Sequence, residues 1–272
     1  MNKTIKKIIL SFILVFSLFM ITGCSIFNNF KRTIVNEIKN EYIEYEQNIT
    51  VTDIEQALQK GAEIAKSCTV GVKIEAKNFI STTNATGSAV IIKKIANDDN
   101  TYTYTAITNR HVTGTATSTE RKVYLGNNIY INANLIAYDN EYDLAIIQFK
   151  TGILLNVANI NIDTPKVGSF AIAVGSPYDL EAFFNTVTIG SISAINRQYL
   201  DEDVNGNEII NTFIQHDAAI NSGNSGGGLF DIYGRLVGIN TWKLSTNFGD
   251  DYEGLNFAIP SSEIKNRFSK YL

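Results

Sequence analysis

The sequence predicts an all-β domain of the antiparallel barrel or sandwich class, and two observations carry this prediction. From Cys68 to Pro260 the chain consists of short alternating or β-branched runs, separated by turn-forming residues at intervals of about 8 to 20 residues. These runs do not alternate with helical segments, which argues against a parallel α/β fold. The predicted strands are Val70–Ile74, Ser88–Lys93, Tyr102–Thr108, Lys122–Leu125, Asn134–Tyr138, Leu144–Phe149, Phe170–Val174, Asn185–Ile195, Thr212–Gln215, Gly228–Phe230, Arg235–Thr241 and Gly254–Ile259.

Two short helices are predicted to flank the strands. The first begins near Thr52 or Asp53, either of which fits as its cap. Its apolar face is expected to consist of Ile54, Leu58, Ala62 and Ala65. The second is an amphipathic helix from Ser262 to Leu272, with its cap in the segment Pro260-Ser261-Ser262-Glu263.

The composition indicates a globular protein. The 272 residues are 44% apolar and only 18% charged, which is enough apolar material for one large core or two small ones. The net charge is −4, the pI is near 5.3, and the basic residues are scattered along the chain. We therefore expect no nucleic-acid partner.

The first 24 residues differ from the rest. Lys3, Lys6 and Lys7 precede an apolar run from Ile8 to Met20, as in a signal peptide. An uncleaved anchor is the alternative, but the run is shorter than the ~20 residues of a spanning helix. The following segment Ile21-Thr22-Gly23-Cys24 resembles a bacterial lipobox.

That resemblance implies removal of residues 1–23 as a lipoprotein signal peptide and lipidation of Cys24. The lipid would anchor the protein to the extracytoplasmic face of the cell membrane. Residues 24–52 are then expected to form a tether, and residues 53–272 the folded domain. Only Cys68 would remain for a disulfide, so we expect none, and the apolar neighbours of Cys68 suggest a small buried side chain.

The segment Gly223-Asn224-Ser225-Gly226-Gly227-Gly228 is the strongest candidate for chemistry. A nucleophilic serine needs a sharp turn that exposes its hydroxyl, and glycines permit such a turn. A glycine-rich hairpin turn with an exposed serine is the competing interpretation. The nucleophile elbow of α/β-hydrolases also matches, but it requires a histidine after the serine. Both histidines of the chain, His111 and His216, precede Ser225, so the order is histidine, aspartate, serine.

The surroundings of the two histidines favour His111 as the base. His111 follows the β-rich run Tyr104–Thr108 at a point where a strand gives way to a loop, whereas His216 is expected at a strand end near the serine loop. Asp143 stands at the start of a buried strand, where a carboxylate needs a partner such as His111. Asp139 fits a plain turn aspartate better. With two histidines and no close His, Glu or Cys spacing, a metal site is not expected.

Taken together, these segments resemble the HtrA-type (Deg) branch of trypsin-like serine proteases. The matching stretches are Ile107–Val112, Asp143–Ile146, Thr186–Ala194, Ile214–Gly227, Gly238–Thr241 and Asn256–Pro260, in the order typical of the family. The resemblance covers about residues 53 to 265 and implies two six-stranded antiparallel barrels with the active site between them.

The resemblance also implies a mechanism. His111 would take a proton from Ser225, Asp143 would orient His111, and an acyl-enzyme would form on Ser225. The oxyanion hole would lie at Gly223, Asn224 and Ser225, with the N–H groups of Gly223 and Ser225 as donors. No metal or cofactor is implied, and the partner would be a protein or peptide substrate.

The resemblance has limits. The chain has Ser222 before Gly-Asn-Ser, Gly228 after the glycine pair, and Arg110 beside the base, each unlike the usual family residue. Since the sequence stops at Leu272, we expect no PDZ module. A homo-oligomer is left open, and so is an inactive relative that serves as a surface binding or adhesion lipoprotein.

Substrate preference rests on positions relative to Ser225. The substrate pocket is predicted to involve Ala219, Ile220, Asn240, Thr241 and Trp242. None of these is acidic, so we expect a preference for small or medium aliphatic residues before the cleaved bond.

Overall fold

The computed structural model describes residues 32–34, 36, 50–77, 82–116, 118–202, 208–245 and 251–272. Side chains at 76–77, 82–83, 201–202, 242–245 and 251–252 lie outside this description, as do the predicted signal peptide and Cys24. The chain divides into a unit up to Glu55 and a unit from Gln56 to Leu272. Among the helices described, none combines the length and the apolar character that crossing a membrane requires.

Helix α2, Val51–Ser67, begins two or three residues earlier than the predicted caps suggest. Its cap is Thr50, not Thr52 or Asp53. The Thr50 hydroxyl accepts a hydrogen bond from the N–H of Asp53 (3.2 Å), and the Asp53 carboxylate accepts one from the N–H of Thr50 (2.9 Å). This reciprocal capping box satisfies two backbone donors at once, which explains why the helix starts there.

The apolar face of α2 packs as predicted along its second half. Ala65 is fully buried, and Leu58 and Ala62 pack against the same apolar cluster. Ile54, which the pattern placed on this face, is 37% exposed.

The first six strands close into a barrel in the order β1-β2-β3-β6-β5-β4, with antiparallel neighbours throughout. Its core includes the stacked rings of Tyr104 and Phe149, whose centroids are 5.3 Å apart. The one-turn helix α3, Arg110–Thr113, follows the third strand. The strands are β1 Thr69–Lys77, β2 Thr82–Ala96, β3 Tyr102–Thr108, β4 Thr119–Tyr124, β5 Tyr130–Tyr138 and β6 Ala145–Thr151.

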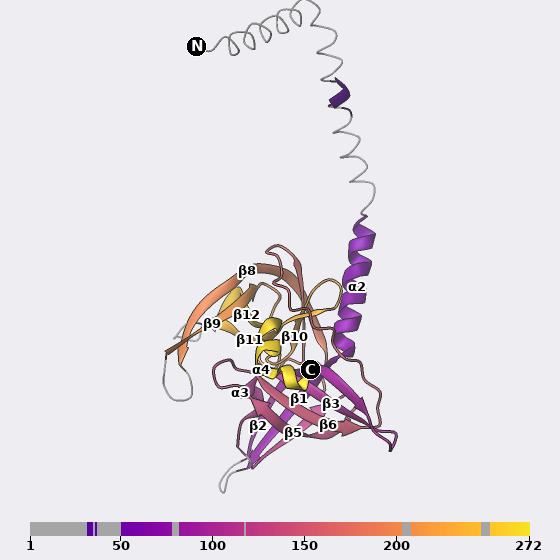
Figure 1. Cartoon of the computed structure of the whole chain (residues 1–272), viewed down its shortest axis with the longest axis vertical. Helices are drawn as coiled ribbons and strands as arrows, with labels where there is room; N and C mark the ends of the chain where they lie inside the picture. Colours follow the sequence, from indigo (N-terminus) through magenta and orange to yellow (C-terminus); the bar gives the residue numbers. More distant parts are fainter. Residues whose placement is uncertain are drawn as a thin grey trace, which may run out of the picture. The chain divides into compact units, whose positions relative to one another are not determined.

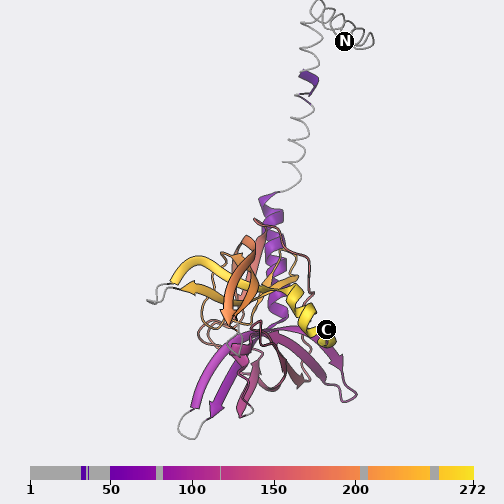
Figure 2. The ribbon, with the colours of Figure 1, turned by 60° about the vertical axis from the view of Figure 1, so that its left-hand side comes forward.

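The other six strands form a second closed barrel in the order β10-β11-β12-β9-β8-β7. Figures 1 and 2 show the two barrels as separate groups of strands, magenta for the first and orange to yellow for the second. The prediction of an all-β fold with two six-stranded antiparallel barrels is therefore confirmed. The strands are β7 Phe170–Gly175, β8 Thr186–Glu202, β9 Glu208–His216, β10 Gly228–Phe230, β11 Leu236–Ser245 and β12 Asp251–Pro260.

A continuous apolar cluster joins the two barrels and the C-terminal helix. It combines side chains of the first barrel such as Leu144 and Ile146 with Ile172 and Ile239 of the second, and with Phe268. Burial of this apolar surface holds the barrels together and fixes the loops that meet at their junction.

Helix α4, Ser261–Phe268, is shorter than the predicted helix, because its last turn continues as the 3-10 helix η1, Ser269–Tyr271. Within the described residues, no side chain caps its N-terminus. The hydroxyl of Ser261 instead donates to the carbonyl of Asn161, which ties the start of the helix to the loop after β6.

Candidate active site

The structure brings His111 and Asp143 together. His111 lies in α3, directly after β3, and Asp143 lies in the loop between β5 and β6. One carboxylate oxygen of Asp143 accepts the main-chain N–H of His111 (2.8 Å), and the other contacts Nδ1 of the imidazole. Two contacts with one carboxylate fix the ring and leave Nε2 as the nitrogen that can accept a proton.

Asp143 is itself held in place from both barrels. Its carbonyl accepts hydrogen bonds from the side-chain amide of Asn109 (2.7 Å) and from the N–H of Arg110 (3.3 Å). The hydroxyl of Thr241, on β11 of the second barrel, donates to its carboxylate (3.3 Å). The carboxylate therefore has partners on several sides, as a partly buried charge requires.

Ser225 lies in the loop before β10, and Thr241 connects it to the His111–Asp143 pair. The Ser225 hydroxyl donates to the carbonyl of Thr241 (3.0 Å), while the Thr241 hydroxyl contacts Asp143. Among the described residues, no hydrogen bond joins Ser225 to His111. Thr241 was predicted only as a pocket residue, so its place between the serine and the aspartate was missed.

The loop around Ser225 is held by a buried serine of the first barrel that the sequence reasoning also missed. The N–H of Ser88 on β2 donates to the carbonyl of Ser225 (2.9 Å), and its hydroxyl donates to the carbonyl of Gly223 (2.8 Å). Gly226, with φ +81°, approaches so closely that a Cβ atom would lie 2.2 Å from the Ser88 carbonyl oxygen. Only glycine fits this combination of positive φ and close approach.

Two N–H groups of the predicted oxyanion hole are free within the described part of the chain. The N–H of Asn224 donates to the carbonyl of Asn221 (2.9 Å), whereas no described group accepts the N–H of Gly223 or Ser225. The carbonyl of Ser222 accepts a hydrogen bond from the N–H of Tyr178 (2.8 Å). Because the C=O of Ser222 and the N–H of Gly223 belong to one trans peptide and point in opposite directions, the Gly223 N–H points away from Tyr178.

The residues predicted for the substrate pocket have different surroundings. Ala219 is exposed and Ile220 is buried. Asn240 is fully buried, and its side chain donates to the carbonyl of Gly228 (3.0 Å). The side chain of Trp242 lies outside the description. The role of this set in substrate binding stays a prediction.

His216 is the last residue of β9, as predicted, and is fully buried. Neither ring nitrogen has a hydrogen-bond partner among the described residues. Burial lowers the pKa of His216 to about 4, although the negative charge of Asp217 and the nearby polar groups of Ala218 and Asn240 favour the protonated ring. His216 is therefore neutral at pH 7. Within the described residues, no group of three His, Cys, Asp or Glu side chains is arranged to hold a metal ion.

Comparisons with known proteins identify relatives over most of the folded region. Residues 87–239 match the family model of the trypsin-like peptidase domain. The serine protease Do-like HtrA of Bacillus subtilis is 39% identical over 185 residues, which cover 68% of this chain and 38% of that protein. The periplasmic serine endoprotease DegP of Escherichia coli is 38% identical over 187 residues, which cover 68% of this chain and 35% of that protein.

Solved structures agree with these relatives. An HtrA-type protease with a bound tripeptide superposes with a TM-score of 0.62 and 29% identity, over 78% of this chain and 62% of the other. A serine endoprotease from Yersinia pestis gives a TM-score of 0.58 and 33% identity, over 78% of this chain and 65% of the other. The chain thus aligns with less than two fifths of the length of the two curated relatives named above.

Proposed function

Because the chain belongs to the family of trypsin-like peptidase domains, we propose that it is a serine endopeptidase with His111, Asp143 and Ser225 as its catalytic triad. The observation that carries this proposal is the pairing of the Asp143 carboxylate with both Nδ1 and the N–H of His111, with Ser225 joined to the pair through Thr241. Relatives named as serine proteases support the same activity.

In this proposal each of the three residues has a role. The Ser225 hydroxyl turns away from the Thr241 carbonyl and donates to Nε2 of His111. His111 then takes the hydroxyl proton as Ser225 attacks the substrate carbonyl, and gives the proton to the leaving amine. Asp143 stabilises the imidazolium that forms in between.

The developing negative charge needs donors that are not already in use. The N–H groups of Gly223 and Ser225 meet this condition, whereas the N–H of Asn224 is engaged with Asn221. We assign the oxyanion hole to Gly223 and Ser225, with Asn224 supplying the turn between them. Water then releases the acyl group from Ser225 by the same steps.

The activity is tested with an unfolded protein substrate such as casein. We expect hydrolysis by the wild-type chain, and losses of at least about 10³-fold in kcat for Ser225→Ala and His111→Ala. A folded wild-type chain that hydrolyses neither casein nor a peptide library would refute the proposal and favour the binding lipoprotein. Cleavage chiefly after Lys or Arg in the library would refute the aliphatic preference.

The N-terminal region supports a location outside the cytoplasm. We propose that residues 1–23 are a leader, that Cys24 carries lipid, and that residues 24–52 connect the lipid to the protease domain, residues 53–272. The relative from Escherichia coli is named as periplasmic. Incorporation of a labelled fatty acid into the wild-type chain, lost in Cys24→Ala, is the expected result. Equal incorporation into both chains would contradict lipidation at this residue.

A further inference from the structure

The loop that carries Asp143 is a closed turn. The Asp139 carboxylate accepts hydrogen bonds from the N–H groups of Glu141 (3.0 Å) and Tyr142 (2.7 Å). The N–H of Asp139 donates to the carbonyl of Leu144 (2.9 Å), which closes the turn around Asp143. The position of the Asp143 backbone therefore depends on how this turn is held.

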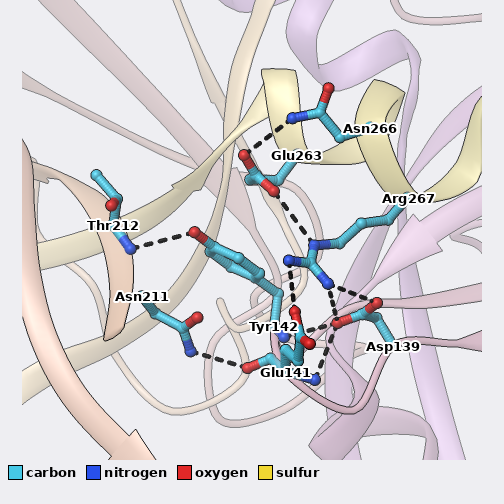
Figure 3. Close-up of polar contacts among 8 residues, drawn as sticks. All are labelled: Asp139, Glu141, Tyr142, Asn211, Thr212, Glu263, Asn266 and Arg267. Atoms are coloured by element: carbon cyan, nitrogen blue, oxygen red, sulfur yellow. Dashed lines mark hydrogen bonds and ion pairs between the residues drawn. The ribbon is translucent and has the colours of Figure 1, made fainter. Parts of the chain in front are cut away.

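A single guanidinium contacts three of the four residues that precede Asp143. Nη1 of Arg267, on α4, lies 2.9 Å from both carboxylate oxygens of Asp139, and Nη2 lies 2.9 Å from the carboxylate of Glu141. The guanidinium carbon lies 4.4 Å from the centroid of the Tyr142 ring. Figure 3 shows Arg267 reaching from the helix to this turn, with Glu263 on the same helix bonded to its Nε (3.2 Å).

Strand β9 of the second barrel holds the same turn from another direction. The side-chain amide of Asn211 donates to the carbonyl of Glu141 (2.8 Å), and the N–H of Thr212 donates to the hydroxyl of Tyr142 (3.2 Å) (Figure 3). The turn thus belongs to the first barrel but is fastened by α4 and by the second barrel. The position of Asp143 relative to Thr241 and Ser225, which both lie in the second barrel, depends on these contacts.

The charges make Arg267 the central member of this cluster. The side chains of Arg267, Asp139 and Glu263 are only 21%, 19% and 20% exposed, so solvent screens their interactions less than at an open surface. Burial opposes the charge of Arg267, but the hydrogen bonds that Arg267 donates to Asp139, Glu141 and Glu263 outweigh that effect and raise its pKa above the ordinary value. Removal of Arg267 would leave three carboxylates close together without their shared cation, and the turn would be expected to shift.

We propose that Arg267 is a positioning residue for catalysis: it fixes the Asp139–Leu144 turn so that the Asp143 carboxylate meets Nδ1 and the N–H of His111. This inference rests on the proposed serine endopeptidase activity. Arg267 does not touch the reacting atoms. Its effect passes through the backbone of the turn, and a displacement of about 1 Å at such a site costs up to about 10²-fold in rate.

The test compares Arg267→Ala and Arg267→Lys with the wild-type chain and with Arg235→Ala. Arg235 is a matched control, because its Nε binds Asp231 (2.7 Å) and its guanidinium stacks on Tyr233 (5.2 Å), away from the Asp143 turn. Active sites are counted by titration with a fluorophosphonate, and kcat, KM and the phosphonylation rate constant are expressed per titrated site. These values do not change when a variant merely has a smaller folded fraction.

We expect Arg267→Ala to lower kcat and the phosphonylation rate constant by about 10-fold or more, with KM within about twofold of wild type. Arg267→Lys keeps the charge but lacks the planar fork, so its kcat should fall between the two. Arg235→Ala should match the wild type in both rate constants. If Arg267→Ala does not fold, the decision passes to Arg267→Lys, for which a wild-type kcat overturns the inference.

Other outcomes separate the two proposals. Variants of Arg267 that melt at lower temperature but keep wild-type rate constants per site would show a purely structural role and overturn the inference alone. A folded wild-type chain that does not react with the fluorophosphonate would refute the endopeptidase proposal, and the positioning role with it.

Discussion

His216 gives the fold a dependence on pH that one substitution should remove. The side chain is fully buried at the end of β9, and neither ring nitrogen has a hydrogen-bond partner among the described residues. A protonated imidazolium in this position would be a buried charge, and the charge of Asp217 and the polar groups of Ala218 and Asn240 offset its desolvation only in part. The perturbation that tests this is His216→Gln, which keeps a polar side chain of similar size but cannot titrate in this pH range.

The sign and the size follow from the pKa. Burial lowers the pKa of His216 from its ordinary 6.5 to about 4, so the unfolded chain binds more protons than the folded chain between these values. Stability is therefore fully present above about pH 6.5 and is lost as the pH falls towards about 4. One pH unit of difference in pKa corresponds to about 1.4 kcal/mol, so His216 contributes a loss of about 3 kcal/mol across this window.

The assay is urea unfolding of both chains at a series of pH values from about 7.5 to about 4. Carboxylates titrate alike in the two chains, so the difference between the two curves isolates His216. We expect the unfolding free energy of the wild type to fall by about 3 kcal/mol more than that of His216→Gln. Parallel curves over the whole range would refute the reasoning and place the ring in contact with water or a proton acceptor.

Three further substitutions or reactions test other parts of the structure. Thr241→Val keeps the side-chain shape but removes the hydroxyl bond that orients the Asp143 carboxylate, and should lower kcat by about 10-fold in the folded chain. A wild-type kcat would contradict this. Gly226→Ala places a methyl group 2.2 Å from the Ser88 carbonyl oxygen at a residue whose φ is +81°. It should therefore lower the urea midpoint of unfolding and slow fluorophosphonate labelling of Ser225. A wild-type midpoint and labelling rate would count against the close approach. The thiol of Cys68 is buried, and burial raises its pKa to about 12. In a Cys24→Ser variant, where Cys68 is the remaining cysteine, the thiol should react with a disulfide reagent at pH 8 only after the chain unfolds. Rapid reaction of the folded chain would show that the thiol is accessible.

Local pattern was sufficient to predict most of the fold. Each predicted strand overlaps an observed one, because alternation and turn residues are local signals. The limits were less accurate: β2 runs from Thr82 to Ala96 and β8 from Thr186 to Glu202, beyond the predicted Ser88–Lys93 and Asn185–Ile195. These extensions are polar or irregular, and only pairing with a neighbouring strand makes them β-structure.

The residues that support the candidate site could not be predicted from one sequence. Asp139 does act as a turn aspartate, but its partner Arg267 lies 128 positions away in the chain. The bond from Thr241 to Asp143 likewise joins residues 98 positions apart. Ser88 has no distinctive neighbours, yet it holds two carbonyls of the serine loop. Such contacts depend on how the two barrels meet, which no local pattern encodes.

The most direct test of the central claim is fluorophosphonate labelling, with the modified residue located by tandem mass spectrometry. The account predicts a single adduct on Ser225 of the wild-type chain, none on Ser225→Ala, and labelling of His111→Ala slowed by at least about 10³-fold. A folded wild-type chain that forms no adduct, or one that carries the adduct on another residue, would contradict the assignment of Ser225 as the nucleophile.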